Sequence, residues 1–264
     1  MTWKIQKRMD VGTSNPIVAR IIIGLSEVAD FTTLPKATKV KLLENCHKIA
    51  EFLINADKAA RPLIDEINSI IADLNLNGVQ TQADGRCINL PHTSTIENSR
   101  LFLKYAKQAL SGVAHNFQII FNKPYQGPHF HKIKAEFNTV FGQEDKLTRL
   151  IAEDEPWIKQ LIELRNEDEH PNSGKPFLSD FDINRTSNNG AYGITLPLFF
   201  NGTAINNILE VYNYNLLTFS EEATALALEK YFISNITILE IPEKDRNPEI
   251  PKRYSFRLKT EPTG

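Results

Sequence analysis

Residues 157–171 read WIKQLIELRNEDEHP, a stretch that combines a helix with an abrupt stop. Apolar side chains recur at Trp157, Leu161 and Leu164, the spacing of one helix face. Proline cannot continue a helix, so Pro171 ends it directly after His170. The helical pattern extends back to about residue 146, and the sequence leaves open whether the helix is interrupted near residue 156. This helix sets the class of the fold.

Helical periodicity also dominates the chain upstream. Apolar residues follow helical spacing from about residue 35 to residue 74, and Pro62 either separates two helices or lies in the first turn of the second. Residues 94–97 (Ser-Thr-Ile-Glu) have capping-box spacing, which predicts a helix from there to about residue 122. A shorter helix is predicted over 130–141. Residues 17–23 fit either a strand or a short helix.

After Pro171 the pattern changes. Residues 172–176 form a turn-like cluster, and alternating apolar residues predict strands over 192–200, 236–241 and 254–258. Between them, Ser220 has the position of an N-cap, with carboxylates following it, so a helix is predicted from about Phe219 to Ile233.

These patterns predict a mainly α fold, an antiparallel helical bundle with a small C-terminal β element. The predicted organisation has three parts. They are an N-terminal segment (1–33), a helical bundle (34–171) and a C-terminal α+β extension packed on the bundle (172–264).

Charge and cysteine content narrow the function classes. A net charge of −2 lacks the basic excess of a tight, non-specific nucleic-acid binder. Cys46 and Cys87 are too few for a disulfide framework or a four-cysteine zinc site, and they fit a reducing compartment. The first residues lack the apolar run of a signal peptide, and the most apolar stretch is too short to span a bilayer. We therefore expect a cytoplasmic protein with no membrane partner.

The strongest chemical signal is the pairing of Arg165 with His170. A guanidinium grips phosphate with a planar fork, and an imidazole moves protons near neutral pH. These are the minimum groups for metal-free RNA cleavage. His170 would act as general base or acid, Arg165 would stabilise charge on the scissile phosphate, and Asn166 would orient His170 or the phosphate.

The run Arg165-Asn166-x-x-x-His170 resembles the motif of the HEPN superfamily. The resemblance implies a small antiparallel helical bundle that dimerises and often acts as a ribonuclease in toxin–antitoxin or defence systems. It implies RNA as substrate and an antitoxin or regulatory protein as a partner. Other members are inactive binding modules. Asn172 departs from the family, because toxins paired with a nucleotidyltransferase tend to carry tyrosine there.

Helix geometry adds a prediction about assembly. Asn166 and His170 lie one turn apart on one face, whereas Arg165 and His170 lie roughly 140° apart. A two-fold homodimer would bring two copies of both residues to a shared cleft, as the resemblance also implies. The carboxylates at 167–169 favour a second reading, in which they hold Arg165 in an internal salt bridge. The alternative function is then a catalytically inactive binding or dimerisation module.

No cofactor or metal is predicted. The chain has no Gly-rich phosphate loop of the dinucleotide or P-loop kind. His129 and His131 have chelating spacing but lack a second ligand pair, so we interpret them as surface residues.

Overall fold

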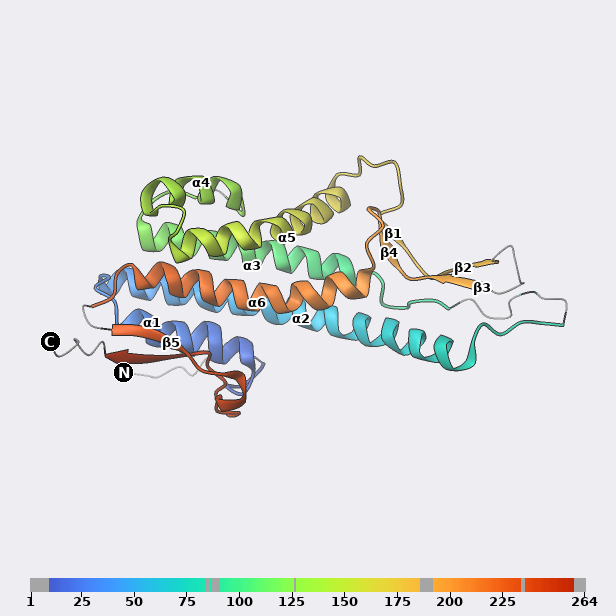
Figure 1. Ribbon diagram of the computed structural model, residues 1–264, viewed down its shortest axis with the longest axis horizontal. Coiled ribbons are helices and arrows are strands. Elements are labelled where there is room, and N and C mark those ends of the chain that lie inside the picture. Colours follow the sequence, from blue (N-terminus) through green and yellow to red (C-terminus); the bar gives the residue numbers. More distant parts are fainter. Residues whose placement is uncertain are drawn as a thin grey trace, which may run out of the picture. The chain divides into compact units, whose positions relative to one another are not determined.

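The chain is mainly α-helical with a small antiparallel β element toward the C-terminus, as predicted (Figure 1). The computed structural model describes residues 10–83, 86, 91–125, 127–185, 192–233 and 236–258; the first residues and Cys87 lie outside them. The elements in chain order are the π-helix η1 (Val18–Gly24), α1 (Leu25–Asp30), α2 (Lys36–Asn77), α3 (Asn98–Phe121), α4 (Phe130–Phe141), α5 (Lys146–Glu169), β1 (Leu178–Ser179), β2 (Asp182–Arg185), β3 (Tyr192–Thr195), β4 (Leu198–Phe199), α6 (Ile205–Glu229), β5 (Ile236–Glu240), the 3-10 helix η2 (Glu243–Asp245) and β6 (Tyr254–Leu258).

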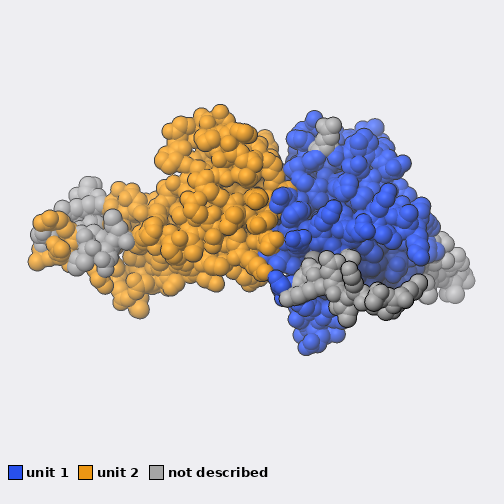
Figure 2. All heavy atoms as spheres, turned by 180° about the vertical axis from the view of Figure 1, so that it is seen from behind, with its two compact units in different colours: residues 1–54, 108–158, 216–264 blue, residues 55–107, 159–215 orange. Residues whose placement is uncertain are grey.

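The chain divides into two compact units, coloured separately in Figure 2. Unit 1 comprises residues 1–54, 108–158 and 216–264, and unit 2 comprises residues 55–107 and 159–215. Helices α2, α3, α5 and α6 each contribute a segment to both units. The three-part division of the sequence at residues 34 and 172 stays a prediction.

Polar side chains link three helices inside unit 1. Asn45 on α2 donates hydrogen bonds to Gly112 O (2.8 Å) and Asn116 Oδ1 (2.7 Å) on α3. Asn116 in turn donates to Thr224 Oγ1 on α6 at 3.0 Å. The close approach of α2 and α3 requires glycine at 112, because a Cβ there would lie 2.5 Å from Cγ1 of the buried Ile49.

Within unit 2, α2 and α6 are antiparallel. Asn213 donates to Asp57 Oδ1 at 2.7 Å, and Asn206 donates to Asn68 Oδ1 at 3.2 Å. From the first bond to the second, the residue number falls on α6 and rises on α2, so the two helices run in opposite directions. The two-stranded antiparallel pairs β1–β4 and β2–β3 belong to this unit, and the β5–β6 pair belongs to unit 1.

Two prolines lie inside helices, which corrects the prediction for Pro62. Helix α2 continues through Pro62, and α5 continues through Pro156. Proline removes one backbone donor from a helix and strains the preceding turn. Around Pro62, Ala59, Ala60 and Leu63 are buried, so tertiary packing holds the helix together across it.

The predicted N-cap at Ser220 is also wrong. Helix α6 begins at Ile205 and passes through Ser220, which is 1% exposed in the helix interior. Buried residues recur at Leu209, Leu216 and Phe219, so the helix packs on both sides of the serine. A serine followed by carboxylates matches an N-cap pattern, but burial of the preceding turns favours one continuous helix.

Helix α3 begins at Asn98, four residues later than predicted, because the capping box does not form. The hydroxyl of Ser94 donates to Glu66 Oε1 at 2.6 Å, and the amide of Thr95 donates to Glu66 Oε2 at 3.0 Å. Burial alone would raise the pKa of Glu66, but the hydrogen bonds from Ser94 and Thr95 outweigh it and lower the pKa to about 2. A carboxylate from α2 thus replaces the local cap.

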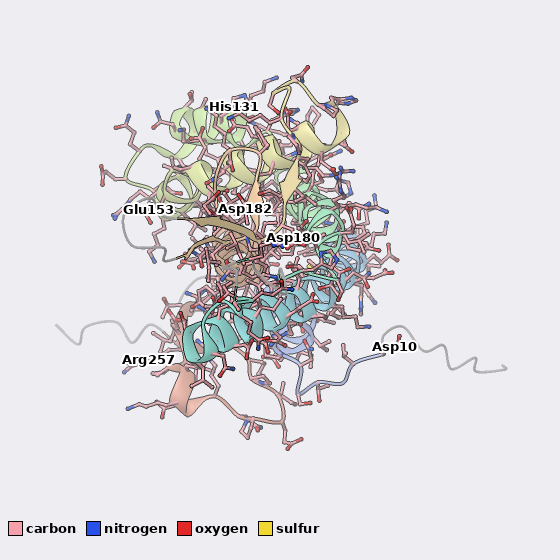
Figure 3. All side chains as sticks on the ribbon, turned by 90° about the vertical axis from the view of Figure 1, so that its right-hand side faces the viewer. Asp10, His131, Glu153, Asp180, Asp182 and Arg257 are labelled. Atoms are coloured by element: carbon pink, nitrogen blue, oxygen red, sulfur yellow. The ribbon has the colours of Figure 1, made fainter. Side chains whose placement is uncertain are left out.

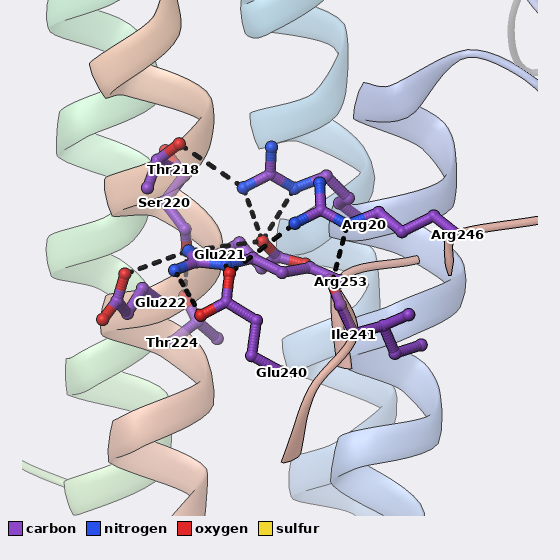
Figure 4. Close-up of polar contacts among 10 residues, drawn as sticks. All are labelled: Arg20, Thr218, Ser220, Glu221, Glu222, Thr224, Glu240, Ile241, Arg246 and Arg253. Atoms are coloured by element: carbon purple, nitrogen blue, oxygen red, sulfur yellow. Dashed lines mark hydrogen bonds and ion pairs between the residues drawn. The ribbon is translucent and has the colours of Figure 1, made fainter. Parts of the chain in front are cut away.

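A buried ion pair joins η1 to α6 in unit 1 (Figure 4). Arg20 Nε donates to Glu221 Oε2 at 2.7 Å, and the two side chains are 7% and 1% exposed. Burial raises the pKa of Glu221, and the positive charge of Arg20 opposes that rise. Arg253, just before β6, contacts Glu222 at 3.0 Å and Glu240 at 2.8 Å, which ties the β5–β6 hairpin to α6.

Breaking this pair on one side should destabilise the protein strongly. Arg20→Met should lower the free energy of unfolding by about 3 kcal/mol, since it leaves Glu221 buried with the more distant Arg253 at 3.9 Å. Arg20→Met/Glu221→Leu removes both charges and should recover most of the loss. Urea denaturation measures both values. A single variant as stable as the wild type would refute a buried charged pair.

Candidate functional site

At the C-terminal turn of α5, the carboxylate of Glu167 binds the backbone just beyond the helix. Glu167 Oε1 accepts hydrogen bonds from the amides of Asn172 (2.9 Å) and Ser173 (2.7 Å). Hydrogen bonds from Ser173, and then from Asn172, lower the pKa of Glu167. Pro171 cannot extend the helix, and Glu167 holds the chain that leaves it. The carboxylate therefore has a local structural role.

Arg165 does not face the solvent as a free cation. Its Nη1 contacts Asp168 Oδ2 at 2.6 Å and its Nη2 contacts Glu169 Oε1 at 2.8 Å. The Arg165 side chain is 16% exposed and that of Asp168 is 7% exposed. Both terminal nitrogens of the guanidinium fork are therefore engaged by carboxylates of its own helix.

Two cations from α3 complete an ion-pair network within unit 2. Arg100 Nη1 contacts Asp168 Oδ1, and Lys107 Nζ contacts Glu169 Oε2 at 3.0 Å. Arg100 also contacts Glu97 at 2.6 Å. The hydrogen bond from Lys107, followed by the charge of Arg165, lowers the pKa of Glu169.

The charges in this network balance. Three cations (Arg100, Lys107, Arg165) meet three carboxylates (Glu97, Asp168, Glu169). A balanced cluster attracts a polyanion weakly, because each added phosphate competes with a carboxylate already in place. The arrangement is chemically suited to holding α3 against α5.

Asn166 and His170 lie at the exposed edge of the network. Both are exposed, and His170 N donates to Asn166 O at 2.8 Å, so they are one turn apart as predicted. Lys107 Nζ lies 3.4 Å from Asn166 Oδ1. Asn166 and His170 thus share one exposed face of a single chain, while Arg165 points into the ion-pair network.

Arg100 and Lys107 were missed by sequence reasoning. They are seven residues apart, which places them on one face of α3. The sequence shows that spacing, but their partners on α5 lie 68 residues (for Arg100) and 62 residues (for Lys107) further along the chain. Only the packing of α3 on α5 brings these charges together.

Tyr212 and the histidines at 129 and 131 contact other side chains of the protein. Tyr212 is buried, and its hydroxyl donates to Gln160 at 2.6 Å. His131 is exposed on α4, as Figure 3 shows, and its ring centroid lies 5.9 Å from that of His129. No group of three or more His, Cys, Asp or Glu residues suited to a metal ion occurs in the described part of the chain. Among those same residues, no helix is both long and apolar enough to cross a membrane.

Asp180, labelled in Figure 3, anchors the segment before α3 in unit 2. It pairs with His92 Nδ1 at 2.6 Å and accepts a hydrogen bond from the Thr93 amide at 3.0 Å. His92 is 76% exposed at its side chain, so this pair is a surface contact.

Comparison with protein-family models, with curated proteins and with solved structures finds no match to this chain. The HEPN resemblance therefore rests on the motif at residues 165–170 and on the helical setting around it.

If Arg165 has a structural role, replacing it should lower the free energy of unfolding. Arg165→Ala should lower the free energy of unfolding by about 1–2 kcal/mol, because Asp168 and Glu169 lose a shared partner. His170→Ala should change it by less than about 0.5 kcal/mol. Urea denaturation measures both, with Arg149→Ala on the same helix as a control, since that side chain is 61% exposed and lies outside the 159–170 face. Equal stability of Arg165→Ala and wild type would contradict the structural role.

Proposed function

We propose that this chain is a HEPN-like helical module that binds a second copy of itself and does not cleave RNA. The observation that carries the proposal is the occupied fork of Arg165, with carboxylates of Asp168 and Glu169 at 2.6 and 2.8 Å. A phosphate at Arg165 would have to displace these carboxylates or accept their repulsion. A reducing cytoplasm is the proposed location, since the chain has only two cysteines.

The exposed face of α5 supports a self-binding role. Lys159, Glu163, Asn166 and His170 are all exposed and follow one another at spacings of four, three and four residues. That spacing places them on one face. The face carries both signs of charge, and Lys159 and Glu163 pair with each other within the helix at 3.8 Å. In two copies related by a two-fold axis, each of these charges can also meet its opposite across the contact.

A second candidate is the metal-independent ribonuclease expected from the motif, with a composite site at a homodimer cleft. The exposure of Asn166 and His170 on one face favours it, with Lys107 3.4 Å from Asn166 Oδ1 as an alternative cation. RNA would be the substrate, His170 the base or acid, and an antitoxin the regulatory partner if the chain is a toxin or defence effector.

RNA incubation separates the two candidates. With single-stranded RNA in EDTA, wild type, His170→Ala and Arg165→Ala should all leave the RNA intact to the same extent, because Arg165 is not free to hold a phosphate. Analysis of the RNA ends by mass spectrometry gives the readout. Cyclic-phosphate ends made by the wild type and lost in both variants would establish the ribonuclease and end the binding-module proposal.

Self-association has its own measurement. Sedimentation equilibrium should show a dimer that Asn166→Glu weakens by about tenfold or more, since two added charges would meet near the two-fold axis. Asn207→Glu is the matched control, because Asn207 is an exposed asparagine on α6 of the same unit. A monomer at all concentrations, or equal weakening by both variants, would reject the α5 face as the interface.

A further inference from the structure

An aromatic hollow in unit 1 has no part in the α5 site. Its volume is about 330 Å³, within the range of small-molecule sites. The apolar lining consists of Phe121, Tyr125, Phe137, Val140, Phe141 and Tyr231, which come from α3, the loop after it, α4 and the turn after α6.

The rings leave apolar surface uncovered. Phe137 is 1% exposed, but the other four aromatic residues are only half-buried, and Val140 is 53% exposed. Phe121 lies 5.2 Å from Phe137 and 5.5 Å from Phe141 between ring centroids, so the walls are held by their own edge and tilted contacts. Aromatic side chains usually bury their faces. A further ring in the hollow would complete this packing.

The hollow also has two ammonium groups beside it, each paired with one carboxylate. Lys123 and Lys230 line it together with a single carboxylate, Glu136. Glu136 Oε1 already accepts hydrogen bonds from Lys123 Nζ (2.7 Å) and from the hydroxyl of Tyr125 (3.3 Å). The carboxylate of Glu136 therefore already has partners within the protein.

Lys230 is the better placed of the two ammonium groups. Its Nζ lies 5.0 Å from the centroid of the Phe141 ring and contacts Asp145. An ammonium has three donors, so hydrogen bonds to a ligand remain available beside Asp145. A carboxylate on a bound ring would meet Lys230 at the wall of the hollow.

We propose that this hollow binds a planar aromatic carboxylic acid of about two fused rings. The aromatic walls hold the ring system, and Lys230, assisted by Lys123, holds the carboxylate. The site lies in unit 1, whereas the α5 face discussed above lies in unit 2. The proposal is therefore independent of the function assigned to that face.

Three probes of one shape test the ligand class. They are 2-naphthoate, naphthalene-2-carboxamide and 2-naphthylmethylammonium, titrated into the whole protein by calorimetry. The anion should bind about tenfold more tightly than the amide, and the cation most weakly. Equal affinity of anion and amide, tightest binding of the cation, or no binding of the anion at millimolar concentration would overturn the proposal.

Variants then locate the binding. Val140→Trp should fill the hollow and weaken 2-naphthoate about tenfold or more, whereas Val211→Trp, at a valine 52% exposed on α6, should not. Lys230→Gln should weaken the anion about tenfold and leave the amide unchanged. Lys104→Gln is its control, because Lys104 also lies over an aromatic ring, 5.5 Å from the centroid of Tyr105. Unchanged naphthoate affinity in both Val140→Trp and Lys230→Gln would show that the probe binds outside the hollow and would overturn the proposal.

Discussion

The buried pair of Arg20 and Glu221 fixes the arrangement of unit 1 around α6. A carboxylate 1% exposed at its side chain needs a cation and good geometry, and Arg20 of η1 supplies the cation at 2.7 Å. Arg253 then joins the same cluster from the C-terminal hairpin (Figure 4). Segments from the first and last parts of the described chain thus meet at one charged group on α6.

Paired charges serve a different purpose in unit 2. The network of Arg165, Asp168 and Glu169 with Arg100 and Lys107 lies nearer the surface and holds α3 on α5. Its geometry also bears on chemistry, because a guanidinium engaged by two carboxylates has little attraction left for phosphate. The same motif can therefore exist with or without a catalytic function, depending on what surrounds the arginine.

The aromatic hollow and the α5 face differ in the kind of binding partner that their side chains suit. The hollow is apolar and has two ammonium groups beside it, each paired with one carboxylate. The donors that remain on these ammonium groups suit a ring that carries a carboxylate. The α5 face is polar and mixed in charge, which suits a macromolecular surface. The hollow belongs to unit 1 and the α5 face to unit 2.

Local sequence determined much of this protein. Apolar periodicity predicted helices at 130–141 and 146–170 almost to the residue, and alternation predicted the β5 and β6 strands, since both depend on neighbours in the chain. Tertiary structure decided the rest. Burial carried α2 through Pro62 and α6 through Ser220, and Glu66 replaced the cap expected at Ser94. The sequence did not decide whether Arg165 is free or held in ion pairs. That depends on which charges packing brings beside it, and α3 supplies two of them.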